Sequence, residues 1–412
     1  MPGVCPPGRR FLFLDCFVSP PSSDPRSWPP VHFIDTPEGL HAAIAEWKEA
    51  DLIGMDCESN SFFAYQERLC LLQVTANGKD YVVDPIALGE ELTAINDLLA
   101  DPEIIVIFHA AEYDMMLLKQ DLGSSVRGLF DTQVAMTLLQ YERTGLAHLL
   151  AENYGLEVSK KEQRSDWGKR PLSDSQIAYA RTDTHYLPDL YQRLHAELVE
   201  KGMLAAAEGE NLRLVTEVLP PREPNYEGWK KLKQARKMNG GELARLRELF
   251  VWREKVAQKI DKPVFRVVAN ETIADLAVNP PRDMRDLASR KGIGWPKAKR
   301  NGDEMLAALG AAKGVEVDTT VKKVDPAERQ RRRIRRENYE ALRGWRKSMA
   351  DELGLPSERL VHRRHLEEIS KQLPRTRESL LQAVQLNDWQ RENLEESLLA
   401  LLAELPDPDQ KS

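Results

Sequence analysis

The alternation of apolar and polar positions predicts strands interleaved with helices in the first half of the chain. A β-hairpin is expected early, because Asn77-Gly78 separates two β-rich runs. Alternating helices and strands follow, so we expect a mixed sheet flanked by helices rather than an all-parallel one. The expected strands are 31–35, 53–58, 69–75, 81–84 and 104–108, and the expected helices are 37–50, 91–99, one opening at 109–114 and one beginning near 173.

The second half of the chain is helical and repeats itself. Trp252-Arg253 recurs as Trp345-Arg346, an offset of about 93 residues, and matching proline, leucine and isoleucine positions follow at the same offset. We therefore expect two copies of one small helical domain. The arginine-rich run 331–336 lies between them and is interpreted as part of a basic tether.

Composition narrows the possible classes of protein. A chain of 412 residues is expected to form two or three domains, and no apolar run reaches the length of a membrane span. The formal net charge is -7, so any affinity for nucleic acid must come from local basic patches. The four cysteines form no CxxC pair, which argues against a zinc site or a disulfide scaffold and favours a reducing, cytoplasmic compartment.

Residues 1–30 differ from the sequence that follows. Arg9-Arg10 precedes a short apolar run that faintly resembles a signal sequence, but Asp15 interrupts the run and no cleavage site follows. Several prolines complete this segment. We interpret it as a disordered extension or as the result of a start site placed too far upstream.

The strand expected at 53–58 carries two acids into an apolar run. Asp56 and Glu58 project from one face of the strand, while Met55 and Cys57 project from the other. Two neighbouring carboxylates repel each other, and partial burial increases the cost. A divalent cation with oxygen ligands would neutralise them. The alternative is a solvated strand end with two unrelated surface acids.

A second group of candidates follows the strand at 104–108. Glu112 and Asp114 both lie at the start of a helix, where the dipole favours acids, so the local pattern does not choose between them. His109 is interpreted as a packed histidine at the strand end, and Asp131 as the N-cap of the next helix.

A third group lies on the helix that begins near 173. Ser173 and Gln176 form a capping box, and Tyr179 and Asp183 are four residues apart and share a face. Pro188 is expected to kink the same helix one turn later.

Taken in order, these blocks resemble the exonuclease motifs of ribonuclease D, in the tyrosine variant of the DEDD superfamily. The helical repeats are similar to tandem HRDC domains, and the resemblance covers about residues 31 to 405. The blocks are Asp56-Cys57-Glu58 with Glu67 to Gln73, then His109 to Asp114, then Gln163 to Trp167 with Arg170-Pro171-Leu172, and finally Tyr179 to Asp183.

The resemblance implies a ribonuclease H-like fold and 3′-to-5′ hydrolysis of RNA, with tRNA 3′ trailers as the typical substrate. It implies two divalent ions, Mg²⁺ or Mn²⁺. Asp56 would bridge both ions, Glu58 and Asp183 would complete the first site, and Asp114 would support the second. Tyr179 would hold the attacking water. The implied partner is RNA with a free 3′ end, bound by a monomer that does not associate with membranes.

The sequence departs from the commoner first motif, D-T-E-F, at two positions. Cys57 replaces the threonine and faces away from the expected ions. Ser59 replaces the phenylalanine that would pack near the terminal base, and whether Phe62 or Phe63 substitutes for it is left open.

The roles of several other residues can be interpreted in two ways. His185 is the residue that another subclass would suggest, but Tyr179 occupies the matching position. Three residues of the third block could either grip phosphates or brace the loop: Arg164, Trp167 and Arg170. The basic residues Lys230, Lys231, Lys233, Arg236 and Lys237, like the run 331–336, could bind the RNA backbone or be solvated charges.

We therefore expect an α/β exonuclease domain with a ribonuclease H-like mixed sheet, followed by two small all-α HRDC-like domains. A DNA 3′-5′ exonuclease and a non-catalytic RNA-binding scaffold are the competing functions. The absence of a P-loop motif excludes a helicase. The expected divisions are an extension at 1–30, the exonuclease domain at 31–219, HRDC-like domains at 225–312 and 337–405, a basic linker at 313–336 and a tail at 406–412.

Overall fold

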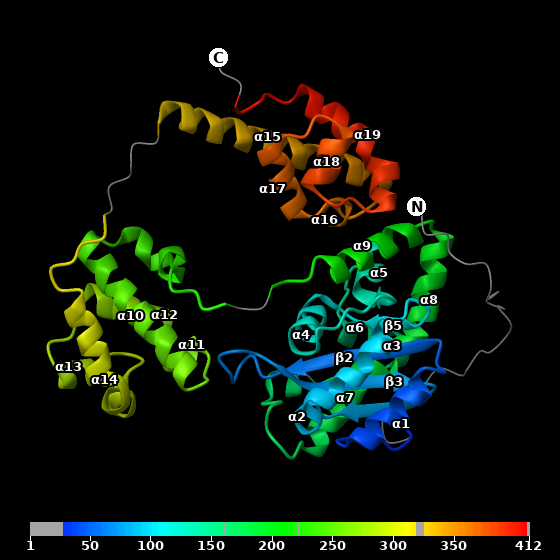
Figure 1. The fold of residues 1–412 in the computed structure, drawn as a ribbon, viewed down its shortest axis with the longest axis horizontal. Coiled ribbons are helices and arrows are strands. Elements are labelled where there is room, and N and C mark those ends of the chain that lie inside the picture. The colour runs from blue at the N-terminus through cyan, green and yellow to red at the C-terminus, as the bar shows by residue number, and fades with distance from the viewer. Residues whose placement is uncertain (1–27, 160, 221–222, 319–324, 410–412) are drawn as a thin grey trace.

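A computed structural model describes residues 28–159, 161–220, 223–318 and 325–409 (Figure 1). The α/β domain is built on one six-stranded sheet in the order β1-β4-β3-β2-β5-β6. Strands β2, β3 and β4 are antiparallel neighbours, and the remaining pairs are parallel, so the mixed sheet predicted from the sequence is confirmed. The strands are β1 (His32–Ile34), β2 (Leu52–Ser59), β3 (Leu69–Ala76), β4 (Lys79–Val83), β5 (Ile105–Phe108) and β6 (Leu129–Asp131).

The hairpin between β3 and β4 turns where the sequence predicts. Asn77 and Gly78 both have positive φ, 51° and 72°, as a two-residue turn with φ > 0 at both central positions requires. This turn sets the register in which Gln73 faces Val82 and Ala76 faces Lys79.

The two faces of β2 lie against different hydrophobic clusters. Met55 and Cys57 lie in the main hydrophobic core, together with Leu72 of the neighbouring strand. Leu71, directly opposite Glu58, lies in a smaller cluster on the other face, where it packs with Ala180 of helix α7 (Asp174–His185). The acids of β2 therefore lie on the face that α7 covers.

The helices of the α/β domain follow the predicted order with two differences. The helix expected at 91–99 is a 3₁₀ helix followed by one α-helical turn, η2 (Gly89–Ile95) and α3 (Asn96–Leu99). Pro188 does not kink one helix. It lies in the first turn of a new helix, α8, where a proline needs no hydrogen bond, because α7 has already ended at His185. The other helices are α1 (Pro37–Trp47), α2 (Pro85–Leu88), α4 (Glu112–Leu122), α5 (Thr132–Leu138), α6 (Leu146–Tyr154), η3 (Glu162–Arg164), α8 (Leu187–Glu200) and α9 (Leu204–Thr216).

Two helical repeats follow. The first helical repeat is preceded by two short 3₁₀ helices, η4 (Gly228–Lys231) and η5 (Lys233–Lys237). It comprises α10 (Gly240–Lys259), α11 (Val264–Val267), α12 (Asn270–Val278), α13 (Met284–Ser289) and α14 (Gly294–Ala311). The second helical repeat comprises α15 (Pro326–Leu353), α16 (Ser357–Leu360), α17 (Arg363–Gln372), α18 (Arg377–Ala383) and α19 (Asp388–Glu404).

The two repeats also have equivalent side-chain hydrogen bonds within each copy. Trp252 donates its indole N–H to Glu304, and Trp345 donates its own to Ser397, 93 residues further along at both ends of the bond. Arg253 donates to the carbonyl of Val268, 2.9 Å away, and Arg346 repeats this bond to the carbonyl of Val361 at 2.8 Å. The offset predicted from the sequence thus reappears in the hydrogen bonds.

The arginine-rich run 331–336 is not an extended tether. It belongs to the first half of the 28-residue helix α15 (Figure 1). Arg331 and Arg332 pair with Glu328 one turn earlier, and Arg335 lies 3.6 Å from Asp409. Residues 319–324 and 410–412, which belong to the predicted linker and tail, lie outside the described residues.

The start of the described chain is packed. Trp28 is buried and stacks on His185, with ring centroids 3.8 Å apart, although it belongs to the segment predicted as an extension. Residues 1–27 lie outside the described residues. Among the helices that are described, none is long and apolar enough to cross a membrane.

Candidate metal centre

Three of the predicted acids converge on one point beside the sheet. Asp56 and Glu58 come from β2, and Asp183 comes from α7, which lies against the same face. One carboxylate oxygen from each lies within 4.8 Å of the others, and all three side chains are half-buried. The strand periodicity that puts Asp56 and Glu58 on one side is therefore completed by an acid 125 residues further along the chain.

A glycine lets α7 come this close to the strand. A Cβ at Gly54, which shares the face of Asp56, would lie 2.9 Å from the carbonyl oxygen of Thr184 and 3.1 Å from Leu187. Thr184 also bonds to Thr75 of β3, hydroxyl to hydroxyl, at 2.8 Å. These contacts fix the end of α7 against the sheet and hold Asp183 over β2.

Asp114 approaches the same strand from α4. Its Oδ1 accepts a hydrogen bond from the backbone N–H of Cys57, 3.1 Å away, and its side chain is 6% exposed. Glu112, the competing acid, is exposed to solvent. The structure therefore brings Asp114 and not Glu112 against the acidic strand.

The turn that starts α4 is held by Asp131. The carboxylate of Asp131 accepts hydrogen bonds from the backbone N–H groups of Ala110 and Ala111, at 3.0 and 2.8 Å. Ala110 has a φ of 64°, which a non-glycine residue adopts only when its surroundings impose it. Asp131 also caps α5, as predicted, by accepting from the N–H groups of Gln133 and Val134.

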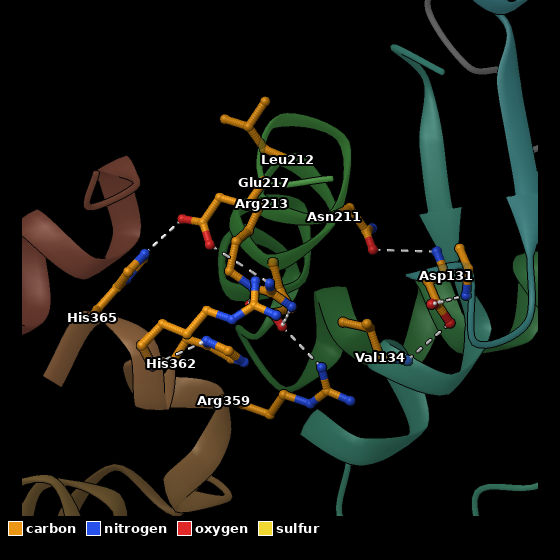
Figure 2. Close-up of polar contacts among 12 residues, drawn as sticks. Asp131, Val134, Asn211, Leu212, Arg213, Glu217, Arg359, His362 and His365 are labelled. Carbon is orange, nitrogen blue, oxygen red and sulfur yellow. Dashed lines mark hydrogen bonds and ion pairs between the residues drawn. The ribbon is translucent and has the colours of Figure 1, made fainter. Parts of the chain in front are cut away.

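Asn211, which no sequence motif singles out, lies behind Asp131. Asn211 is buried on α9 and accepts a hydrogen bond from the backbone N–H of Asp131 through its Oδ1, 3.3 Å away (Figure 2). The adjacent residue, Glu210, pairs with Arg359 of the second helical repeat at 2.9 Å. One helix thus contacts both the Asp131 turn and the second helical repeat.

Burial raises the pKa of every acid in the centre, and the charges of neighbouring carboxylates raise it further for Glu58, Asp114 and Asp183. Burial is the first cause for Asp56, and burial followed by the charges of Asp56 and Asp183 raises the pKa of Glu58. The pKa values of Asp114 and Asp183 are raised by burial and then by the nearby Asp56. Ionised carboxylates this close together require a compensating positive charge.

Tyr179 lies one helical turn before Asp183. Burial, and then the charges of Asp183 and Glu58, raise the pKa of the Tyr179 hydroxyl, so it stays protonated. Its hydrogen bond with the Asp183 carboxylate lowers the pKa of that acid. Trp167, buried on the same side of the sheet, packs against the Tyr179 ring, with centroids 6.1 Å apart.

The residues of the centre fit a divalent cation. Carboxylate oxygens are the ligands that Mg²⁺ and Mn²⁺ prefer. Beside them, Gln73 lies directly opposite Asp56 on β3, fully buried. Neither amide atom of Gln73 has a hydrogen-bond partner among the described residues. Four raised pKa values and an unsatisfied buried amide indicate a polar site that is complete only with further ligands.

Two of the three residues with open readings brace the loop before α7. Arg170 makes a two-pronged ion pair with Asp84, with bonds of 2.6 and 2.7 Å, and also donates to the carbonyl of Cys70. Trp167 is buried in the cluster around Ala180. Arg164 alone of the three is exposed, with its guanidinium 5.9 Å from the centroid of the Phe62 ring.

The two candidate histidines, His109 and His185, do not join the acids of the metal centre. His185 points to Asp80, with Nδ1 3.0 Å from the carboxylate. His109 lies at the end of β5, where its Nδ1 is 2.9 Å from the Thr132 hydroxyl. The five basic residues of 230–237 lie on η4 and η5, and all five are exposed.

Comparisons with known proteins identify the families to which the parts of the chain are similar. The family described as 3′-5′ exonuclease matches residues 31–199, and the HRDC domain family matches residues 242–309 and 335–402. The chain is 31% identical over 285 residues to "Ribonuclease D" of Gluconacetobacter diazotrophicus, which covers 68% of this chain and 72% of the relative. It is 32% identical over 292 residues to "Exosome complex exonuclease RRP6" of Saccharomyces cerevisiae, covering 67% of this chain but 40% of that longer protein.

Among solved structures, the catalytic core of RRP6 from Trypanosoma brucei superposes with a TM-score of 0.64 at 27% identity. That match covers 69% of this chain and 80% of the other.

Proposed function

Because the chain belongs to the ribonuclease D and RRP6 family of 3′-5′ exonucleases, we propose that it hydrolyses RNA from a free 3′ end and releases 5′-mononucleotides. The observation that carries the proposal is the convergence of Asp56, Glu58 and Asp183 within 4.8 Å, with Asp114 against the same strand. Precursors of tRNA are the substrate class proposed by analogy with ribonuclease D.

In this proposal the acids hold two divalent ions, Mg²⁺ or Mn²⁺. Asp56, Glu58 and Asp183 would hold the first, and Asp56 and Asp114 would hold the second. When bound, such a pair supplies Lewis-acid activation of water and neutralises the charge on the leaving oxygen.

The remaining work falls to the chain's own groups. The Asp131 turn and the Cys57 amide keep Asp114 in place before any ion arrives. Tyr179 keeps its proton and lies beside Asp183, so its hydroxyl can hold a water molecule at the edge of the carboxylate group. Burial of these groups strengthens each electrostatic interaction among them.

The first test measures degradation of RNA and DNA strands of the same sequence, labelled at the 5′ end, with and without chelator. We expect stepwise shortening of RNA from the 3′ end, loss of activity in excess chelator, and no cleavage of a circular RNA. Faster degradation of DNA would favour the DNA exonuclease. Absence of cleavage with full RNA binding would favour the scaffold.

The second test separates the tyrosine from the acids. Tyr179→Phe removes one hydroxyl and keeps every carboxylate, so turnover should fall by on the order of 10²–10⁴ while metal dependence and RNA affinity stay unchanged. Asp183→Asn should lower turnover and metal affinity together. Tyr141→Phe is the matched control, because it removes another tyrosine hydroxyl that bonds to a carboxylate, Glu197, outside the centre. Normal turnover in a folded Tyr179→Phe enzyme would assign Tyr179 to packing alone.

A further inference from the structure

The loop between β2 and β3 leaves the sheet directly after the acidic strand. It is closed on itself: Phe63 and Ala64 donate their backbone N–H groups to the carbonyl of Asn60, and Arg68 donates its own to the Asn60 side chain, at 2.7, 2.9 and 3.0 Å. Phe62 lies four residues after Glu58, so its backbone is at most about 14 Å from that of the acid. The backbone at Phe62 therefore stays within this distance of the acidic strand.

The first helical repeat holds this loop from outside. Arg266 donates to the carbonyl of Phe62 at 2.7 Å, and Lys262 donates to that of Phe63 at 3.2 Å. Tyr65 anchors the end of the loop: its N–H donates to Asp261, its hydroxyl donates to Glu254, and its ring lies in the core of the repeat. The position of the loop is thus set by residues that lie about 200 positions further along the chain.

The two phenylalanines of the loop have different surroundings. The guanidinium of Arg266 covers Phe63, 4.5 Å from the ring centroid. Phe62 is 44% exposed, and its ring is approached by Arg164 from the loop before α7. An aromatic ring that is fixed through its backbone, open to solvent and next to a cation matches the way single-stranded nucleic acid is bound, by base stacking with a basic group for the phosphate.

We propose that Phe62 stacks on a base near the RNA 3′ end, that Arg164 contacts the neighbouring phosphate, and that the first helical repeat sets the position of Phe62 through Arg266. This assignment rests on the proposed exoribonuclease function. In the commoner first motif, an aromatic residue at the position of Ser59 would pack near the terminal base. The proposal assigns that role to Phe62, and not to Phe63, which Arg266 covers. It also makes the first helical repeat part of the substrate site.

The experiment compares Phe62→Ala with Phe33→Ala in the full-length enzyme. Phe33, on the edge strand β1, is 41% exposed and serves as the matched control. The substrates are one single-stranded RNA and versions that carry an abasic nucleotide at each of the last few 3′ positions. Phe62→Ala should raise KM by on the order of 5- to 100-fold, the range for one stacked base, and leave kcat nearly unchanged. Phe62→Trp should restore KM, and Phe33→Ala should behave as wild type.

The abasic substrates identify the contact. At the stacked position, the abasic nucleotide should weaken wild type by about the same factor and add nothing to the loss in Phe62→Ala, as expected for two halves of one interaction. Equal KM for Phe62→Ala and wild type, or equal losses on normal and abasic RNA at every position tested, would overturn the assignment while RNA cleavage by wild type stood. Failure of wild type to cleave RNA would overturn the proposed function and this assignment together.

A second pair of variants tests the part played by the first helical repeat. Arg266→Ala should raise KM in the same direction, and the double variant Arg266→Ala/Phe62→Ala should be no worse than Phe62→Ala alone. Arg359→Ala, at the equivalent position of the second helical repeat, should leave KM unchanged. Additive losses in the double variant would show that Arg266 does not act through Phe62.

Discussion

The two helical repeats use the same edge of the domain to contact the exonuclease domain, at two different places. In the first helical repeat, Asp261 accepts from Tyr65 and Arg266 bonds to the carbonyl of Phe62. The positions 93 residues later behave alike: the carbonyl of Gly354 accepts from Gln140, and Arg359 pairs with Glu210. A repeated domain has thus kept its docking edge while the surface that it meets has changed.

The surroundings of the two contacts differ in kind. The core of the first helical repeat is separate from that of the exonuclease domain. It includes Tyr65, from the loop between β2 and β3. The core of the second helical repeat is continuous with the main exonuclease core. A Cβ at Gly209 of α9 would overlap the amide of Asn387, so helix and repeat are in close contact there. The first helical repeat therefore holds one loop of the exonuclease domain, whereas the second helical repeat extends its core.

The largest effect should follow from breaking the contact of the second helical repeat. Glu210 is 6% exposed and pairs with both Arg213 and Arg359. Glu210→Ala leaves two arginines without this partner, so the free energy of unfolding measured in urea should fall by about 3–5 kcal/mol. Arg359→Ala keeps the Glu210–Arg213 pair and should cost less. A loss below that of Arg359→Ala would show that this cluster does not brace the fold.

A smaller effect should separate the two interior arginines. Arg253 is 2% exposed and bonds to Asn270 as well as to the carbonyl of Val268. Arg253→Met leaves the carbonyl of the buried Val268 without its donor and should cost about 1–3 kcal/mol in the free energy of unfolding. Arg346→Met should cost less, because Arg346 is more exposed than Arg253. It also lacks the second bond, since Arg363 occupies the position equivalent to Asn270. Chemical unfolding of both variants tests the order, and equal losses would mean that the second bond does not contribute.

The smallest effect should be a dependence on pH at the second contact. His365 Nε2 lies 2.6 Å from Glu217 Oε1 (Figure 2). Burial opposes ionisation of Glu217, but the hydrogen bond from His365 and the charges of His365, Arg213 and His362 outweigh it and lower the pKa of Glu217. The stabilisation is therefore present above the unfolded-state pKa of about 4.3 and is lost as the pH falls through the lower folded-state pKa.

Hydrogen exchange of the second helical repeat should become faster as the pH is lowered below about 4.3, the unfolded-state pKa of a glutamate. The first helical repeat serves as the internal control. Glu217→Gln should remove the dependence. Identical acid profiles for the two repeats in wild type would contradict it.

Much of the fold was predictable because its determinants are local. Asn77-Gly78 is one of few pairs that tolerate positive φ twice, and Ser173 with Gln176 forms its capping box within one turn. Pro188 by itself predicts a kink, but a proline is also favourable in the first turn of a new helix, which is where the structure places it. The arginine-rich run predicts a basic tether, whereas residues 331–336 are helical; Glu328, one turn earlier, pairs with Arg331 and Arg332 and so favours the helix.

Local periodicity already groups the candidate residues: a period of 2 puts Asp56 and Glu58 on one face of a strand, a period of 3.6 puts Tyr179 and Asp183 on one face of a helix, and the 93-residue offset defines the repeats. Three contacts follow from no local pattern and are seen only in the folded chain: Asp183 lies beside the strand acids, Asn211 bonds to the Asp131 turn, and Arg266 holds the loop that carries Phe62. The physical reason is one of range. Backbone periodicity and capping depend on neighbours within a few residues, whereas a contact between residues 80 or 200 positions apart depends on how whole surfaces fit together.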